Sequence, residues 1–287
     1  MKKSFLIMLT LSRLGVCNII RVALYRMALK IKFSAIRKLG RTTPIVKAPF
    51  YQSSDKTSPN LVAMAPLFGY HSQAARDRPP DWLTSPLNGR VFENANRPFW
   101  DIADFDSNVG DIKQIWELSR FGWVLDFALA AGKGNTSELN RLIMWLEDWL
   151  NHNPPYQRPN WKCGQEASIR VLHLIAANAL VGQDSQACPG LCQLITLHLQ
   201  RISPTIGYAK AQDNNHGTSE AAALFVGGHF LLQNGQESGH KWAIQGRKFL
   251  ENRVARLIGK DGSFSQYSVN YHRMMLDALS ILSLIHI

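Results

Sequence analysis

Apolar residues recur at helical spacing through the last two thirds of the chain. In the clearest segment, Leu139, Leu142, Leu146 and Trp149 stand at i, i+3, i+7 and i+10, which form one face of a helix. The same kind of pattern returns at residues 172–179, 191–202, 221–228, 250–258 and 274–285. Together with residues 112–131, these segments predict seven helices, separated by Gly, Pro, Asn and Asp.

Evenly spaced helices with short connections are expected to form antiparallel hairpins. Stacked hairpins give a solenoid when they run on and a toroid when they close. The chain shows no consensus of the tetratricopeptide or ankyrin kind, which makes a uniform solenoid the weaker interpretation. The sequence therefore predicts an all-α fold, an incomplete (α/α) toroid of antiparallel helical hairpins over residues 99–287.

Two segments of different character precede the helices. Residues 1–40 are basic and amphipathic, and the apolar run at residues 5–11 has the character of a signal peptide until Arg13 interrupts it. The segment is too interrupted to span a bilayer, so we expect a helix that packs on the protein, with peripheral membrane contact as the alternative. Residues 41–98 are rich in Pro, Ser and Asn and predict an irregular wrapping segment. Short strands are expected in it near residues 60–64 and 89–92.

Composition and charge narrow the class of partner. With 46% hydrophobic residues and eight Trp, the 287 residues are expected to fold around a large core. The 32 Lys and Arg exceed the 21 acidic residues, which favours a polyanionic partner. No nucleic-acid-binding motif is present, so nucleic acid is the weakest of these candidates. The four cysteines show neither a paired framework nor the spacing of a zinc site, and no metal is expected.

Three polar clusters, at residues 160–166, 213–220 and 261–273, each lie at or near the expected start of a helix. Purely structural explanations exist for each of them. Gly217 is an acceptable N-cap with Glu220 three residues later. Glu166 and Arg170 are four residues apart and can form an ion pair on one helix face, as can Arg273 with Asp277.

Four motifs stand in order along the chain. They are Asp111-Ile112-Lys113 with Trp116 to Arg120; Asn160-Trp161 with Gly164 and Glu166; Asn214-Asn215-His216 with Glu220; and Asp261-Gly262-Ser263 with Tyr271-His272-Arg273. These motifs resemble those of the heparinase II/III-like polysaccharide lyases. The resemblance covers about residues 85–285 and is to the N-terminal α/α-toroid domain of that family.

The resemblance implies cleavage of a uronic-acid-containing polysaccharide by β-elimination, without a cofactor. Asn215 and His216 are expected to neutralise the substrate carboxylate, and Tyr271 to move the proton. Trp161, Glu166, Arg170, Glu220, His272 and Arg273 are the expected substrate-binding residues. The implied partner is an acidic polysaccharide, and the implied location is the periplasm or cell envelope.

Two departures from the family pattern affect what we expect of the active site. Relatives continue into a β-sandwich domain that closes the cleft, whereas this sequence stops within its seventh expected helix, so we expect a fragment with an incomplete active site. Some relatives also carry an acidic residue at the position of Gln266.

Two alternatives to the lyase stay open. The first is a non-catalytic carbohydrate-binding or scaffold protein built on the same toroid. The second is a glycoside hydrolase that uses Glu166 and Glu220 as its carboxylate pair.

Overall fold

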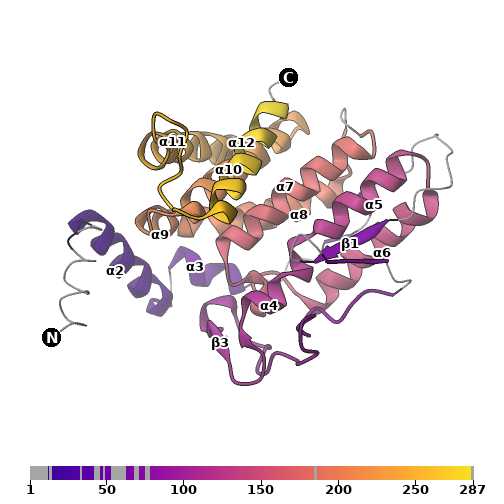
Figure 1. Ribbon diagram of the computed structural model, residues 1–287, viewed down its shortest axis with the longest axis horizontal. Coiled ribbons are helices and arrows are strands. Elements are labelled where there is room, and N and C mark those ends of the chain that lie inside the picture. Colours follow the sequence, from indigo (N-terminus) through magenta and orange to yellow (C-terminus); the bar gives the residue numbers. More distant parts are fainter. Residues whose placement is uncertain are drawn as a thin grey trace.

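The computed structural model describes residues 12, 15–32, 34–41, 46–47, 49–52, 63–67, 71–74, 78–183 and 186–285. Within these residues the long elements are all helices (Figure 1). They are α2 (Val16–Lys30), α5 (Gly122–Gly132), α6 (Thr136–His152), α7 (Gly164–Leu180), α8 (Pro189–Ile202), α10 (Asn215–Gln233), α11 (Gly239–Leu257) and α12 (Val269–Ile285). The shorter helices are α3 (Ala35–Lys38), α4 (Lys113–Trp116) and α9 (Ile206–Ala211).

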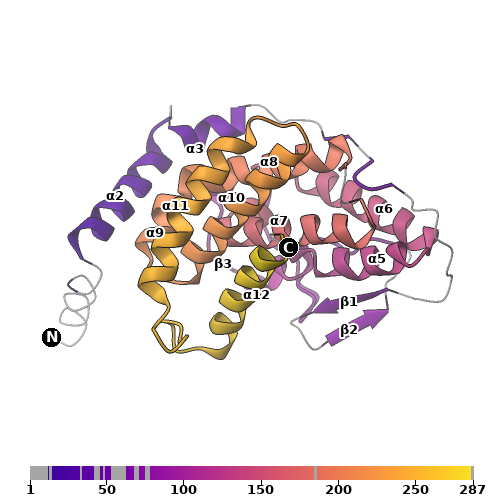
Figure 2. The ribbon, with the colours of Figure 1, turned by 90° about the horizontal axis from the view of Figure 1, so that it is seen from above.

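The helices form consecutive hairpins, as the spacing of apolar segments predicted. α5 packs on α6, α7 on α8, and α10 on α11, while α7 and α10 also contact each other and join the hairpins into one curved array (Figures 1 and 2). α12 packs against α10 (Figure 2). The all-α toroid prediction is therefore confirmed.

Strands are short and few in the described part of the chain. β1 (Met64–Leu67) pairs antiparallel with β2 (His71–Ala74), and β3 (Phe105–Asp106) pairs antiparallel with β4 (Gly110–Asp111). Most of the strand expected near residues 60–64 lies outside the described residues. The strand expected near residues 89–92 is absent, because Val91 forms only an isolated bridge with Thr84.

The single helix expected over residues 112–131 is interrupted. α4 is followed by the 3₁₀ turn Leu118–Arg120, and Phe121 then adopts a left-handed conformation with φ of 64° before α5 begins. The buried Phe121 ring packs edge-on against Trp149, with 4.9 Å between centroids, so tertiary packing holds the reversal. Apolar periodicity cannot reveal one left-handed residue, and the prediction of an unbroken helix was wrong.

Part of the Pro-rich segment belongs to the same hydrophobic core as the helices. Phe50, Tyr51 and Trp82 are almost completely buried in it. The Tyr51 hydroxyl donates a hydrogen bond to the carbonyl of Leu174 in α7 (3.0 Å), and Trp82 Nε1 donates to Asp148 of α6 (2.7 Å). These contacts attach Tyr51 to α7 and Trp82 to α6.

The α10–α11 pair is the most closely packed. A Cβ added to Gly246 of α11 would lie 2.2 Å from the backbone nitrogen of Phe225 in α10, so no larger residue fits. Because Gly lets the two backbones touch, the position of α10 is closely fixed by α11.

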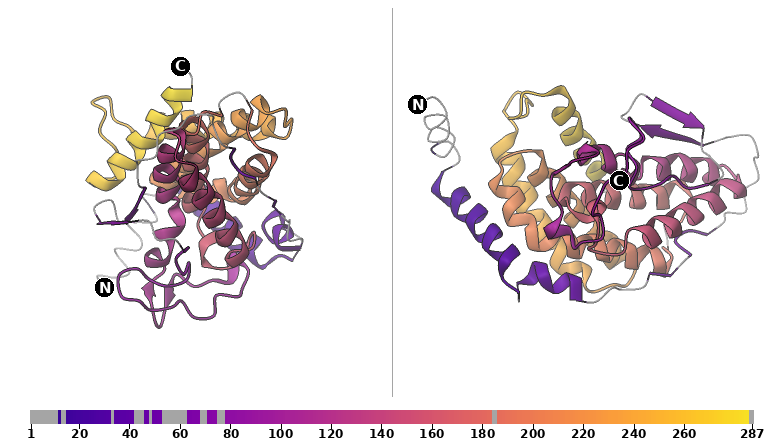
Figure 3. Two further views of the ribbon diagram at one scale, coloured as in Figure 1. Left: turned by 90° about the vertical axis from the view of Figure 1, so that its right-hand side faces the viewer. Right: turned by 90° about the horizontal axis from the view of Figure 1, so that it is seen from below.

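α2 packs along α9 at one edge of the molecule (Figure 3). Tyr25 of α2 stacks on Tyr208 of α9 with 4.0 Å between ring centroids, and Asn18 donates to Asp213 Oδ2 (3.1 Å). The apolar run at residues 5–11 lies outside the described residues. Among the helices of the described residues, none has both the length and the apolar character that crossing a bilayer requires.

Candidate functional site

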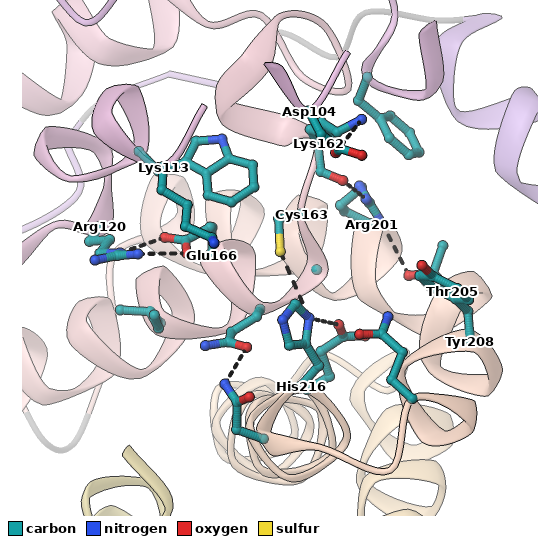
Figure 4. A pocket seen from close by; sticks show the side chains of 18 of the residues that line it. Asp104, Lys113, Arg120, Lys162, Cys163, Glu166, Arg201, Thr205, Tyr208 and His216 are labelled. Carbon is teal, nitrogen blue, oxygen red and sulfur yellow. Dashed lines mark hydrogen bonds and ion pairs between the residues drawn. The ribbon is translucent and has the colours of Figure 1, made fainter. Parts of the chain in front are cut away.

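A cavity of about 920 Å³ opens where α7, α10 and α12 begin. Residues of α2 and α9 and the segment from Phe99 to Arg120 complete its walls. Six cationic and five acidic side chains line it, with His216 in its central part (Figure 4). Its volume is in the range of ligand-binding clefts, and its many charged groups suit a hydrophilic, charged ligand.

The start of α10 presents its first residues to this cavity. Asn214, rather than Gly217, is the N-cap, and its side chain accepts a hydrogen bond from the backbone nitrogen of His216 (3.0 Å). The Asn215 amide donates to Gln165 Oε1 (2.7 Å), and the Asn215 backbone nitrogen donates to Gln266 Oε1 (2.7 Å). Two other segments, the start of α7 and the loop before α12, therefore hold Asn215 in place.

His216 lies between two partners at the limit of contact. Its Nδ1 is 4.0 Å from Glu220 Oε1 and 4.0 Å from Cys163 Sγ. Burial lowers the pKa of His216 and outweighs the opposing effect of Glu220, so the imidazole is neutral at neutral pH. A neutral imidazole has one N–H to donate and one nitrogen to accept.

Glu220 is the most perturbed carboxyl group of the site. It is 3% exposed, and its Oε2 has no hydrogen-bond partner among the described residues. Burial raises its pKa to about 8, so it is protonated at neutral pH. A Cβ on Gly164 would lie 2.6 Å from Glu220 Oε1, which explains the glycine at the first position of α7.

An ion-paired group forms one wall of the cavity. Arg120 binds Glu166 through two hydrogen bonds, Nε to Oε2 (2.7 Å) and NH2 to Oε1 (3.0 Å), and it also pairs with Glu117 (2.7 Å). The nearby Glu166 carboxylate raises the pKa of Arg120. Lys113 extends from α4 beside this group (Figure 4).

The opposite wall carries two more cations. Lys162 Nζ lies 3.1 Å from Asp104 and also donates to the carbonyl of Ile102. The buried Arg201 donates to the carbonyls of Trp161 (2.7 Å) and Lys162 and to the Thr205 hydroxyl (3.1 Å), and its guanidinium lies over the Phe99 ring. Tyr25 and Tyr208 line the cavity at this end.

Six of the nine predicted site residues line the cavity. They are Asn215, His216, Tyr271, Glu166, Glu220 and Arg273. Tyr271 comes from the first turn of α12 and is 37% exposed, whereas Asn215 and His216 come from the first turn of α10. Residues far apart in the sequence are thus brought to one hollow.

The other three predicted residues lie elsewhere. Trp161 and Arg170 are fully buried and line no part of the cavity. Arg170 donates to His198 Nε2 (2.9 Å) and to the carbonyls of Ser119 (3.2 Å) and Asn160 (2.8 Å). A side chain enclosed in this way has no free atom for a sugar, so Trp161 and Arg170 hold the structure beneath the cavity instead. His272, half-buried on α12, also lies outside the lining.

Sequence reasoning assigned no role to several residues of the lining. Lys113, Arg120, Lys162 and Gln165 stood inside the motifs, and their charge or amide groups were the signal available. Tyr25, Arg201 and Tyr208 occur in ordinary helical segments, where nothing in the spacing separates them from other helix residues. No group of three or more His, Cys, Asp or Glu side chains in the described residues is arranged to hold a metal ion.

Comparison with known proteins agrees with the geometry. The sequence model of the family described as Heparinase II/III N-terminus matches residues 69–286. Comparison with curated proteins found no match, and comparison with solved structures found none either. Because the match covers most of the chain and includes the helices that form the cavity, the chain belongs to the heparinase II/III N-terminal family.

Proposed function

We propose that the cavity binds an acidic polysaccharide and cleaves it next to a uronic acid by β-elimination. The observation that carries this proposal is the convergence of Asn215, His216 and Tyr271, from the starts of α10 and α12, on one cavity. Membership of the heparinase II/III N-terminal family supports a polysaccharide-lyase-like protein. The reaction, the substrate and the residue roles are our proposal.

The first requirement of such a reaction is to make the C5 proton of the uronic acid more acidic. Hydrogen-bond donors placed against the substrate carboxylate offset its charge and stabilise the electron density that develops on it. The Asn215 amide, the neutral His216 imidazole and the protonated Glu220 carboxyl can each supply a donor. All three come from the first two turns of α10.

The second requirement is a group that removes the proton and returns it. Tyr271 takes the C5 proton as general base, the C4–O bond breaks with formation of the C4=C5 double bond, and a proton from Tyr271 passes to the departing oxygen. The partly exposed position of Tyr271 on the cavity wall leaves its hydroxyl accessible to a bound chain. No other reactant is needed, because the electron pair of the C5–H bond becomes the new π bond.

Charge on both walls suits a polyanionic chain. Lys113 and Arg120 lie on one side of His216, and Lys162 and Arg201 lie on the other (Figure 4). Arg120 and Arg201 are held by partners within the protein, so Lys113 on one wall and Lys162 on the other are the cations that can bind the anionic groups of neighbouring sugar units on both sides of the cleaved bond.

The hydrolase alternative fits the geometry less well. It needs one carboxyl group as acid and one free carboxylate as base or nucleophile. Glu220 meets the first requirement because it is protonated. Glu166 does not meet the second, because Arg120 binds both of its oxygens.

The test is incubation with uronate-containing polysaccharides and measurement of ultraviolet-absorbing unsaturated ends. Tyr271→Phe is expected to lower turnover by about 10²- to 10⁴-fold, the usual contribution of a general acid or base, and to leave polymer affinity almost unchanged. Tyr267→Phe is the matched control, because Tyr267 is fully exposed four residues earlier.

Other results would replace the proposal. Products with reducing ends but no double bond would identify a hydrolase. Polymer binding without turnover in both the wild type and Tyr271→Phe would identify a non-catalytic carbohydrate-binding protein.

A further inference from the structure

α2 has one exposed face that is entirely apolar. Val16, Ile20, Leu24, Met27 and Ile31 are 71%, 50%, 59%, 57% and 51% exposed. Their spacing of four, four, three and four residues places them within about 80° of arc around the helix axis. We call these five residues the α2 stripe.

The opposite face of α2 is held by the protein. Asn18 is buried and donates to Asp213, and Tyr25 stacks on Tyr208. Asp213 is in turn bound by Arg253 (2.6 Å) and Arg256 (2.6 Å) of α11. These contacts fix the rotation of α2, so the α2 stripe points away from the domain, along the outer edge seen in Figures 2 and 3.

Positive charge is concentrated in the same part of the chain. The first 54 residues contain 11 Lys and Arg and no acidic residue, whereas the remaining 233 contain 21 of each sign. The whole net charge of +11 is therefore carried by the N-terminal segment. On α2 itself, the exposed Arg26 and Lys30 lie on one flank of the α2 stripe and the half-buried Arg21 lies on the other.

We propose that α2 lies in the interface of an anionic membrane, with the α2 stripe among the lipid chains and the flanking cations at the headgroups. An apolar face bordered by Lys and Arg is the pattern of interfacial helices, which bind by buried apolar area and by attraction to anionic lipids. The 15 residues of α2 lie on the surface in this arrangement and do not cross it. This inference does not depend on the proposed lyase activity.

Other occupants fit the observations less well. A soluble polyanion would pair with the cations but would leave the α2 stripe in water. A second copy of the chain would cover the stripe but would bring two segments of charge +11 together, which is repulsive. Only an anionic apolar layer satisfies both features at once.

The test is co-sedimentation of the full chain with lipid vesicles. We expect binding to vesicles that contain phosphatidylglycerol, weak binding to pure phosphatidylcholine, and loss of binding at high salt. The double variant Leu24→Ser with Met27→Ser should bind at least about tenfold more weakly, because it removes two of the five apolar side chains. Lys30→Gln with Lys32→Gln should reduce binding about tenfold at low salt and less at high salt.

Two controls separate this effect from general changes. Ile244→Ser replaces an aliphatic residue of α11 with 56% exposure, and Lys248→Gln with Lys260→Gln removes two exposed charges elsewhere. Both are expected to bind vesicles as the wild type does.

Three results would overturn the proposal. The first is no binding to anionic vesicles by the wild type. The second is unchanged binding by the Leu24→Ser, Met27→Ser variant. The third is a wild-type dimer that the same variant converts to a monomer, which would assign the α2 stripe to a second copy.

Discussion

The starts of α7 and α10 carry similar residues, but their glutamate side chains differ in their hydrogen-bond partners. Both helices follow a polar loop rich in Asn, and both place a Glu in their first two turns: Glu166 in α7 and Glu220 in α10. Arg120 donates a hydrogen bond to each oxygen of Glu166, whereas Glu220 keeps a buried oxygen without a partner among the described residues. Near the start of α7 the polar groups therefore stabilise the protein, and at the start of α10 they stay available to a ligand.

The contrast extends to the residues around each helix. Arg170 of α7 uses its guanidinium on His198 and two backbone carbonyls and lies against the rings of Trp149 (5.1 Å) and Trp161 (5.6 Å). Among the described residues, the His216 imidazole of α10 has polar partners only at 4.0 Å. The two side chains differ in exposure and in bonding: Arg170 is fully buried with its hydrogen bonds satisfied, whereas the His216 side chain is 31% exposed.

The largest expected effect comes from Arg170→Ala. The change leaves His198 Nε2 and the carbonyls of Ser119 and Asn160 without a donor and opens a cavity, so the free energy of unfolding should fall by about 4 kcal/mol or more. Thermal or denaturant unfolding measures it. Arg247→Ala, at an exposed ion pair on α11, is the control and should leave stability almost unchanged. Reduced polymer binding by Arg170→Ala with unchanged unfolding would mean that Arg170 contacts substrate.

The second effect tests the protonated Glu220. Its pKa rises from about 4.5 in the unfolded chain to about 8 in the protein, so its contribution to stability is full below pH 4.5 and is lost as the pH rises through 8. Each pH unit in that window costs up to about 1.4 kcal/mol. Glu220→Gln removes this dependence and should stabilise the protein by about 3 kcal/mol at pH 7.

The measurement is unfolding of the wild type and Glu220→Gln from pH 4 to pH 8.5. The two curves should meet at the acidic end and separate as the pH rises. Glu251→Gln, on the exposed surface of α11, should follow the wild type throughout. Parallel curves for Glu220→Gln and the wild type would mean that Glu220 is ionised in the folded protein.

The sequence predicted the regular helices of the fold but not the break between α4 and α5. Apolar periodicity located α6, α7, α8, α10, α11 and α12, because each buries one regular face. It could not locate the break at Phe121, which depends on contact with Trp149 from α6. Local pattern predicts elements, whereas a left-handed residue held by a distant ring is a property of the whole fold.

The residues of the candidate site also divide into those that the sequence predicted and those that only the fold reveals. Asn215, His216 and Tyr271 were predicted from motifs that resemble a known family, and all three line the cavity. Trp161 stands in another of these motifs and Arg170 follows that motif, but both lie in the core. Residue type does not reveal whether a hydrogen-bond partner such as His198 will be present. Tyr208 was missed because only the packing of α9 against α2 brings it to the cavity.

The smallest expected effect concerns Gln266, which joins the loop before α12 to the start of α10. Its Oε1 accepts a hydrogen bond from the Asn215 backbone nitrogen, one of the first amides of the helix and therefore without a partner inside it. Gln266→Ala should lower the free energy of unfolding by about 1 kcal/mol. Gln266→Glu should keep the acceptor and gain a few tenths of a kcal/mol from the helix dipole.

The exposed neighbour Ser265 offers a control, Ser265→Ala, that should leave stability unchanged. Equal loss in the Ala and Glu variants would mean that Gln266 acts through its amide nitrogen. The predicted order, Glu at least as stable as Gln and both above Ala, would show that the fold requires an oxygen acceptor at this position and that either side chain provides one.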